Sequence, residues 1–124
     1  QHYLEMVGLQ DNGNEIAGSL SHGQKQWLEL GILLAQESDL MLLDEPAAGM
    51  TDDETEKMGV LLRDIAVERS VLVVEHDMEF VRQFAQIVTV MHEGRILCEG
   101  TMEEVQANDK VAEVYLERRV NADE

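Results

Sequence analysis

The sequence is poor in cysteine and in basic residues, and each shortage excludes a class of protein. With one cysteine, Cys98, the chain has no disulfide framework, and we expect a reducing compartment. Nine basic residues stand against 26 acidic ones, which gives a net charge of -17. A nucleic-acid surface needs clustered Lys and Arg. We therefore predict no nucleic-acid partner and assign the acidity to solvated helix faces.

Long apolar runs are also missing. No run approaches the roughly 20 apolar residues of a transmembrane helix, and no signal-peptide pattern is present. The first residue is Gln1 rather than Met, so this position need not be a natural start.

A phosphate-binding loop is the third absence. The pattern GxxxxGK[ST] does not occur. The segment 18–23 has its glycine spacing, but Gln24 stands where Lys is required, and no strand is expected before Gly18. The triphosphate cradle of a P-loop protein is therefore not expected in this chain.

The sequence contains alternating strand and helix patterns, and its length fits one domain. The chain has 124 residues, 44% of them hydrophobic, enough for one core. Short apolar runs predict strands, and apolar residues at helical spacing predict helices, which together give an α/β layered domain. The expected strands are 40–44, 70–75, 87–91 and 95–98, the last two as a hairpin. The expected helices are 21–36, 52–68, 102–107 and 109–118, and residues 1–9 are expected to end a helix. Asp77 can cap a further short helix that carries Phe80, Val81 and Phe84.

Three helix starts carry the same local signal. A Ser or Thr followed three residues later by Glu or Gln is a capping box, in which each side chain bonds the other residue's backbone N–H. The pairs are Ser21 with Gln24, Thr51 with Glu54, and Thr101 with Glu104.

The strand 40–44 is the element around which the chain is organised. Its apolar run predicts a strand buried on both faces, and it ends in Asp44, followed by Glu45 and Pro46. Open α/β sheets bind ligands at the carboxyl ends of their strands. There Asp44 could hold Mg²⁺ and Glu45 could polarise a water for attack on a phosphate. A helix cap or a solvated turn is the alternative for these two acids.

Two further stretches could contact phosphate. The segment 21–24 opens a helix, where free N–H groups and the helix dipole favour an anion; a plain N-cap is the alternative. His76 follows the predicted strand 70–75 and could contact a γ-phosphate or a water, or be purely structural.

Together these stretches resemble the ATP-binding subunits of ABC transporters, over nearly the whole chain. Segment 20–24 is similar to the signature motif, with His22 where a second glycine is commoner. Segment 40–44 resembles the Walker B strand, 48–51 the D-loop, and His76 the switch histidine. Within the family the chain resembles the branched-chain amino acid and urea group through 45–49 and 75–78. The segments 24–29, 50–52 and 114–116 look more like the urea-type subunit.

The resemblance implies a P-loop NTPase-like ABC fold, mostly parallel, that is incomplete because the Walker A strand and loop are absent. Residues 1–39 would end the helical and signature region, and 40–124 would run from Walker B to the carboxyl terminus. ATP and Mg²⁺ are the implied cofactors of an intact subunit, and this chain alone is expected to be inactive. This chain departs from the family at one D-loop position, where Thr51 stands in place of the usual acid.

The resemblance assigns a role to each site residue. Glu45 is the catalytic carboxylate, His76 contacts the γ-phosphate and Asp44 positions Mg²⁺. Four residues would contact the γ-phosphate of ATP held by a second subunit in a head-to-tail dimer: Ser21, His22, Gly23 and Gln24. Thr51 is assigned to the D-loop. Membrane permease subunits are the other implied partner, with the protein on the cytoplasmic face of the cell membrane.

Two alternatives to import of urea or branched-chain amino acids remain open at this stage. One is a non-catalytic ABC-like interaction domain, and the other is an ABC-type ATPase of DNA repair, which the charge of -17 disfavours. We also expect the chain alone to self-associate, because a missing central strand leaves exposed strand edges.

Overall fold

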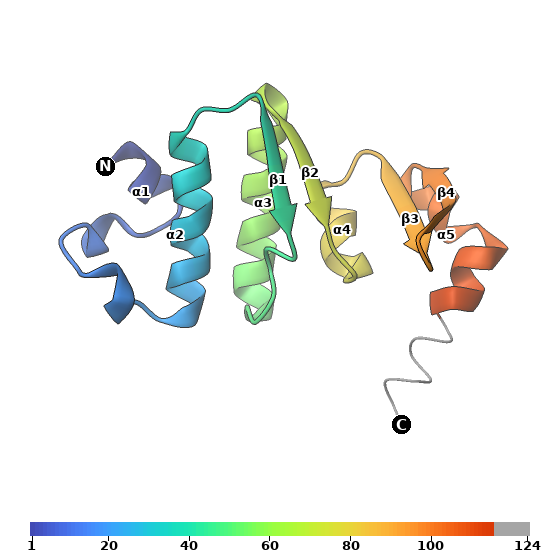
Figure 1. The fold of residues 1–124 in the computed structure, drawn as a ribbon, viewed down its shortest axis with the longest axis horizontal. Coiled ribbons are helices and arrows are strands. Elements are labelled where there is room, and N and C mark those ends of the chain that lie inside the picture. The colour runs from blue at the N-terminus through green and yellow to red at the C-terminus, as the bar shows by residue number, and fades with distance from the viewer. Residues whose placement is uncertain (116–124) are drawn as a thin grey trace. The chain divides into compact units, whose positions relative to one another are not determined.

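The computed structural model describes residues 1–115. They divide into two compact units, the first from Gln1 to Gln83 and the second beginning at Phe84. The first unit holds α1 to α4 with strands β1 and β2, and the second holds β3, β4 and α5 (Figure 1).

Two long helices of the first unit begin where their capping boxes predict. Helix α2 spans His22–Ala35 and α3 spans Asp52–Glu68. Both capping boxes, at Ser21 and at Thr51, are formed in full, which confirms the two predicted starts. Each box supplies partners to backbone N–H groups that the first helical turn leaves unpaired.

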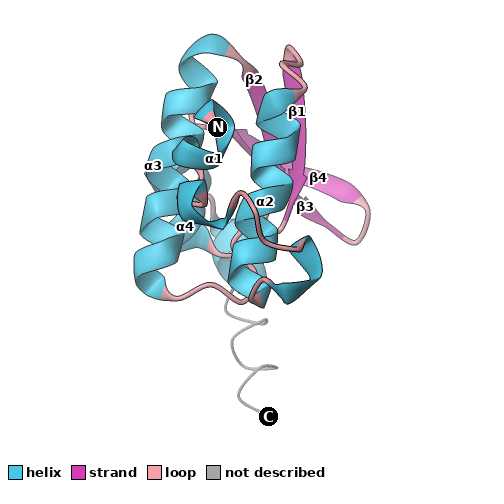
Figure 2. Ribbon diagram, turned by 90° about the vertical axis from the view of Figure 1, so that its left-hand side faces the viewer, coloured by secondary structure: helices cyan, strands magenta, loops and turns pink. Residues whose placement is uncertain are grey.

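Strands β1 (Leu40–Asp44) and β2 (Ser70–Val74) form a parallel pair, joined by α3 as the crossover. Their register sets Asp44 opposite Val74, so both strands end at the same edge of the pair. Helices α2 and α3 lie on one side of this pair (Figure 2). Parallel pairing thus places the residues after Asp44 and after Val74 close together.

The prediction that β1 is buried on both faces is wrong. Burial alternates along β1: Met41 and Leu43 are buried, whereas Leu42 is 63% exposed. Along β2, Leu72 and Val74 are exposed in the same way. Helices cover one face only among the described residues, so the apolar run reflects a hydrophobic face that residues 1–115 leave open to solvent.

The core of the first unit forms where that covered face meets the helices. Helical spacing puts Leu30 and Leu34 on one stripe of α2, and Met58, Leu62 and Ile65 on one stripe of α3. Short helix α4 (Met78–Phe84) starts at Asp77, whose Oδ1 accepts hydrogen bonds from the N–H groups of Glu79 and Phe80. Asp77 was the predicted cap of this helix.

Helix α1 (His2–Met6) packs against α2, and a hydrogen bond joins it to the residue that follows the C-terminal end of α2. The Tyr3 hydroxyl donates a hydrogen bond to Oε1 of Glu37, which follows α2. This bond, with smaller contributions from desolvation and the Glu37 charge, raises the pKa of Tyr3 above its ordinary value. Two short 3₁₀ turns, Gln10–Asn12 and Ala17–Ser19, connect α1 to α2.

The second unit is a hairpin followed by helix. Strands β3 (Val88–His92) and β4 (Arg95–Gly100) pair antiparallel through the predicted turn at 93–94, with an irregularity between Val90 and Met91. Helix α5 (Met102–Gln106) begins at Thr101, whose hydroxyl accepts from the Glu104 N–H. The reciprocal bond is not formed, so only half of this predicted box is present.

Residues 109–115 are also helical, and positions 116–118 of the predicted last helix lie outside the described residues. Within 1–115, no helix combines the length and the apolar character needed to cross a membrane.

Candidate functional site

The carboxylate of Glu45 and the ring of His76 meet at the shared end of β1 and β2. The Glu45 N–H donates to the Val74 carbonyl, 2.8 Å away, which extends the strand pairing by one residue. Nδ1 of His76 lies 2.8 Å from Oε1 of Glu45, although 31 positions separate the two residues. Both side chains are partly exposed, 65% for His76 and 48% for Glu45. The structure therefore brings together the two residues expected to be catalytic.

The backbone of Glu45 is unusual. Its φ is +46°, in the left-handed region that residues other than glycine seldom adopt. This conformation turns the chain sharply after β1 and directs the Glu45 side chain toward the end of β2. The turn is held by a hydrogen bond from the Ala48 N–H to the Glu45 carbonyl, at 3.1 Å.

Glu75 joins this pair and was not predicted as a site residue. Its side chain is only 5% exposed. Its Oε1 accepts from the backbone N–H of His76 at 3.1 Å and lies 3.7 Å from Nδ1 of that residue. One ligand atom from each of Glu45, Glu75 and His76 falls within 4.8 Å of the others. An acid next to a histidine at a strand end was the available signal, but Glu75 was interpreted only as the last residue of the strand.

Asp44 stands apart from this three-residue group. It ends β1, is exposed, and its carboxylate has no hydrogen-bond or ion-pair partner among residues 1–115. A free carboxylate of this kind is a ligand type that Mg²⁺ accepts, directly or through water. The donor chemistry at this edge therefore fits a hard cation.

The start of α2 offers backbone donors. Oγ of Ser21 accepts from the Gln24 N–H at 3.1 Å, and Oε1 of Gln24 accepts from the Ser21 N–H at 3.0 Å. Ser21 and Gln24 were both predicted to contact phosphate. In the structure, the side chain of each instead accepts a hydrogen bond from the backbone N–H of the other. The N–H groups of His22 and Gly23, in the first helical turn, have no partner among the described residues, so they are the donors available to an anion.

The loop 46–50 lies against this helix start. Gly49 has a φ of +77°, and a Cβ built on it would lie 3.4 Å from Cδ2 of the His22 ring. Thr51, the next predicted site residue, is the N-cap of α3, with its Oγ1 accepting from the Glu54 N–H at 3.3 Å. Thr51 therefore has a structural role in this arrangement, independent of any role toward ATP.

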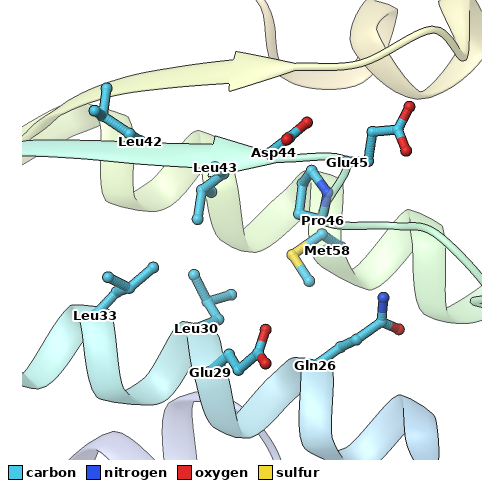
Figure 3. Close-up of a pocket in the computed structure, with 10 residues that line it drawn as sticks. All are labelled: Gln26, Glu29, Leu30, Leu33, Leu42, Leu43, Asp44, Glu45, Pro46 and Met58. Carbon is cyan, nitrogen blue, oxygen red and sulfur yellow. The ribbon is translucent and has the colours of Figure 1, made fainter.

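A pocket of about 200 Å³ lies between α2 and the end of β1 (Figure 3). Its walls combine apolar side chains with the acids at the strand end. Its lining consists of Gln26, Glu29, Leu30, Leu33, Leu42, Leu43, Asp44, Glu45, Pro46 and Met58.

Comparison with known proteins agrees with the fold. Residues 1–48 match the ABC transporter family, and residues 95–116 match the branched-chain amino acid ATP-binding cassette transporter family. An ATP-binding cassette of an ABC transporter, solved in its ADP conformation, superposes with a TM-score of 0.81 at 28% identity, covering 93% of this chain and 47% of that one. The chain belongs to the ATP-binding cassette family of ABC transporters.

The curated relatives are transport ATP-binding proteins. The high-affinity branched-chain amino acid transport ATP-binding protein BraF of Pseudomonas aeruginosa is 35% identical over 117 residues, 93% of this chain and 46% of the relative. LivG of Escherichia coli, described in the same words, is 31% identical over 92% of this chain and 46% of its own length. The glutamine transport ATP-binding protein GlnQ of Geobacillus stearothermophilus is 35% identical over 97% of this chain and 51% of its own. The chain thus spans about half the length of the relatives it matches.

Proposed function

We propose that this chain forms the carboxyl-terminal part of an ATP-binding subunit that powers import of branched-chain amino acids by an ABC transporter. The observation that carries the proposal is the 2.8 Å contact between Glu45 and His76 at the ends of two parallel strands. A carboxylate and an imidazole held together at this edge can act on one water and one phosphate. The relatives BraF and LivG support the solute class.

Each residue at this edge has one proposed task. Mg²⁺–ATP, when bound, supplies the phosphoryl group and the charge that its transfer requires. Glu45 orients and polarises the attacking water, and His76 contacts the γ-phosphate and keeps the Glu45 carboxylate in place. Asp44 would hold Mg²⁺. Glu75, bonded to the His76 backbone, fixes the position from which His76 acts.

The start of α2 acts on a different nucleotide in this proposal. The free N–H groups of His22 and Gly23, with the Ser21 hydroxyl, contact the γ-phosphate of ATP held by a second subunit in a head-to-tail dimer. Gln24 contributes once its bond to Ser21 is released, and Thr51 lies in the loop that connects the two sites. The remaining partners are permease subunits, which bring the protein to the cytoplasmic face of the membrane.

A urea-type subunit is the second candidate. It is favoured by the segments 24–29 and 50–52, on which the sequence likeness to that group rests. Uptake of labelled leucine and of labelled urea by cells that express the subunit with its own permease distinguishes the two candidates.

The test of the catalytic proposal is Glu45→Gln in a subunit that carries this sequence together with a phosphate-binding loop. Because Gln cannot accept a proton from water, we expect kcat for ATP hydrolysis to fall about 100-fold or more with ATP binding retained. Glu29→Gln is the matched control, since Glu29 lines the pocket but does not contact His76. Calorimetry on this chain alone is expected to detect no ATP binding, because GxxxxGK[ST] is absent.

Three outcomes would contradict the proposal. Full hydrolysis by the Glu45→Gln variant would remove Glu45 from the mechanism. A wild-type subunit that binds ATP without hydrolysing it would favour the non-catalytic interaction domain. Tight ATP binding by this chain alone would show that the triphosphate is held by residues other than those proposed.

A further inference from the structure

Gln26 connects helix α2 to the loop that follows Glu45. It lies in the second turn of α2, and its Nε2 donates a hydrogen bond of 2.5 Å to the carbonyl of Ala48, 22 positions further along the chain. Figure 3 shows the Gln26 amide directed from α2 toward the segment that follows Pro46. A side chain in the interior of a helix thus holds the backbone of a loop.

Only one of the two polar atoms of the Gln26 amide has a hydrogen-bond partner among the described residues. Its Oε1 is buried and accepts no hydrogen bond among the described residues. A buried acceptor without a partner lowers the stability of the folded state. Exchanging the amide's oxygen and nitrogen would not help, since it would set an acceptor against the Ala48 carbonyl. The position therefore retains an amide at a cost, and the bond to Ala48 is what that amide provides.

The loop is held by α2 at two consecutive residues. Gln26 bonds Ala48, and the ring of His22, one turn earlier, packs over Gly49. Within the loop, the Ala48 N–H donates to the Glu45 carbonyl and the Met50 N–H donates to the Ala47 carbonyl, each at 3.1 Å. The backbone of Glu45 is therefore bonded to the same residue, Ala48, that Gln26 bonds from α2.

We propose that Gln26 is a positioning residue for Glu45. By holding Ala48, Gln26 keeps the left-handed turn at Glu45 in the conformation that directs its carboxylate to His76. The start of α2 and the Glu45–His76 pair then move together, so a ligand that displaces α2 also displaces the carboxylate. This inference rests on the proposed function, because it assigns Gln26 an effect on catalysis through Glu45.

The first experiment examines the loop in this chain and needs no ATPase activity. Gln26→Leu removes the donor at similar volume, and Gln36→Leu makes the same change at the exposed C-cap of α2. With one hydrogen bond to the loop lost, we expect amide exchange at Ala48 and Met50 to quicken about tenfold in the first variant and to stay unchanged in the second. Unchanged exchange in Gln26→Leu, at a Tm equal to that of the control, would overturn the proposal.

The second experiment measures catalysis in the subunit used for Glu45→Gln. We expect Gln26→Leu to lower kcat about tenfold with KM for ATP unchanged, because a displaced general base slows chemistry without touching the nucleotide cradle. Combined with Glu45→Gln, it is expected to lower the residual rate no further. A loss of equal size in both backgrounds would mean a general structural defect and would overturn the proposal. An active Glu45→Gln single variant would instead refute the proposed function, so the two failures are distinguishable.

Discussion

The uncovered face of β1 and β2 predicts that the chain alone self-associates. Four apolar side chains on this face are more than half exposed, and β1–β2 pairing sets Leu42 directly opposite Leu72. Full burial of such a side chain contributes roughly 1.5–3 kcal/mol, so burying the exposed half contributes about 1 kcal/mol each. The four are Leu40 at 54%, Leu42 at 63%, Leu72 at 58% and Val74 at 58%.

Two copies that meet through this face bury eight such side chains, or about 8 kcal/mol by the same area arithmetic. At the low end of the association cost, about 4 kcal/mol, the net free energy of association is about -4 kcal/mol, which gives a weak dimer with Kd on the order of 1 mM. The charge of -17 on each copy opposes association, and this repulsion is screened as salt is added. We therefore expect a dimer that strengthens from low to high ionic strength.

Leu42→Thr with Leu72→Thr tests the face without changing the net charge. The pair of substitutions removes half of the apolar contribution, so we expect the dimer to weaken about 100-fold or more in sedimentation equilibrium. Val67→Thr is the control, since Val67 is 83% exposed but lies on α3. A wild-type chain that stays monomeric at about 1 mM in high salt would refute the reasoning. Equal weakening by Val67→Thr would refute the choice of face.

Two further predictions concern the loops and the helix ends. Gly49→Ala and Gly8→Ala both put Cβ at a positive φ, and we expect each to lower the free energy of unfolding in urea by about 1–2 kcal/mol. The two costs should agree, because His22 meets the new Cβ of Gly49 at an ordinary distance and Gly8 meets nothing; a much larger cost at Gly49 would contradict this. Glu37→Ala removes the acceptor that raises the pKa of Tyr3, so the Tyr3 ring should titrate at lower pH by NMR. In the wild-type chain, the raised pKa of Tyr3 stabilises the fold below the unfolded-state pKa of Tyr3, and this stabilisation is lost as pH rises through the folded-state pKa. We expect Glu37→Ala to abolish this pH-dependent stabilisation. An unchanged Tyr3 titration in the variant would exclude Glu37 as the cause of the raised pKa.

Local signals in the sequence were sufficient for most element boundaries. Capping boxes are interactions between residues three apart, so Ser21 and Thr51 marked the starts of α2 and α3 without tertiary information. The strand 40–44 and the hairpin at 93–94 were likewise identified from short apolar runs and a turn. Parallel pairing then required Glu45 and His76 to share an edge, and the structure confirms that they meet.

Features that depend on distant neighbours could not be predicted in this way. An apolar run does not tell how many of its faces are covered, and for β1 the answer depends on residues outside the strand. The bond from Gln26 to Ala48 spans 22 positions and has no local pattern. Glu75 was visible as an acid beside His76, but its near-complete burial follows from packing rather than from its place in the sequence.

The left-handed backbone of Glu45 sets two requirements on one residue. Backbone energetics alone favour Gly, Asn or Asp at a φ of +46°, because a longer side chain there costs of order 1–3 kcal/mol. Gly and Asn have no carboxylate, and the Asp side chain is one methylene shorter than that of Glu. The 2.8 Å contact with His76 therefore requires Glu at this position. Selecting variants of position 45 for thermal stability would therefore select against the carboxylate, and a stabilised version of this domain should keep Glu45 fixed from the outset.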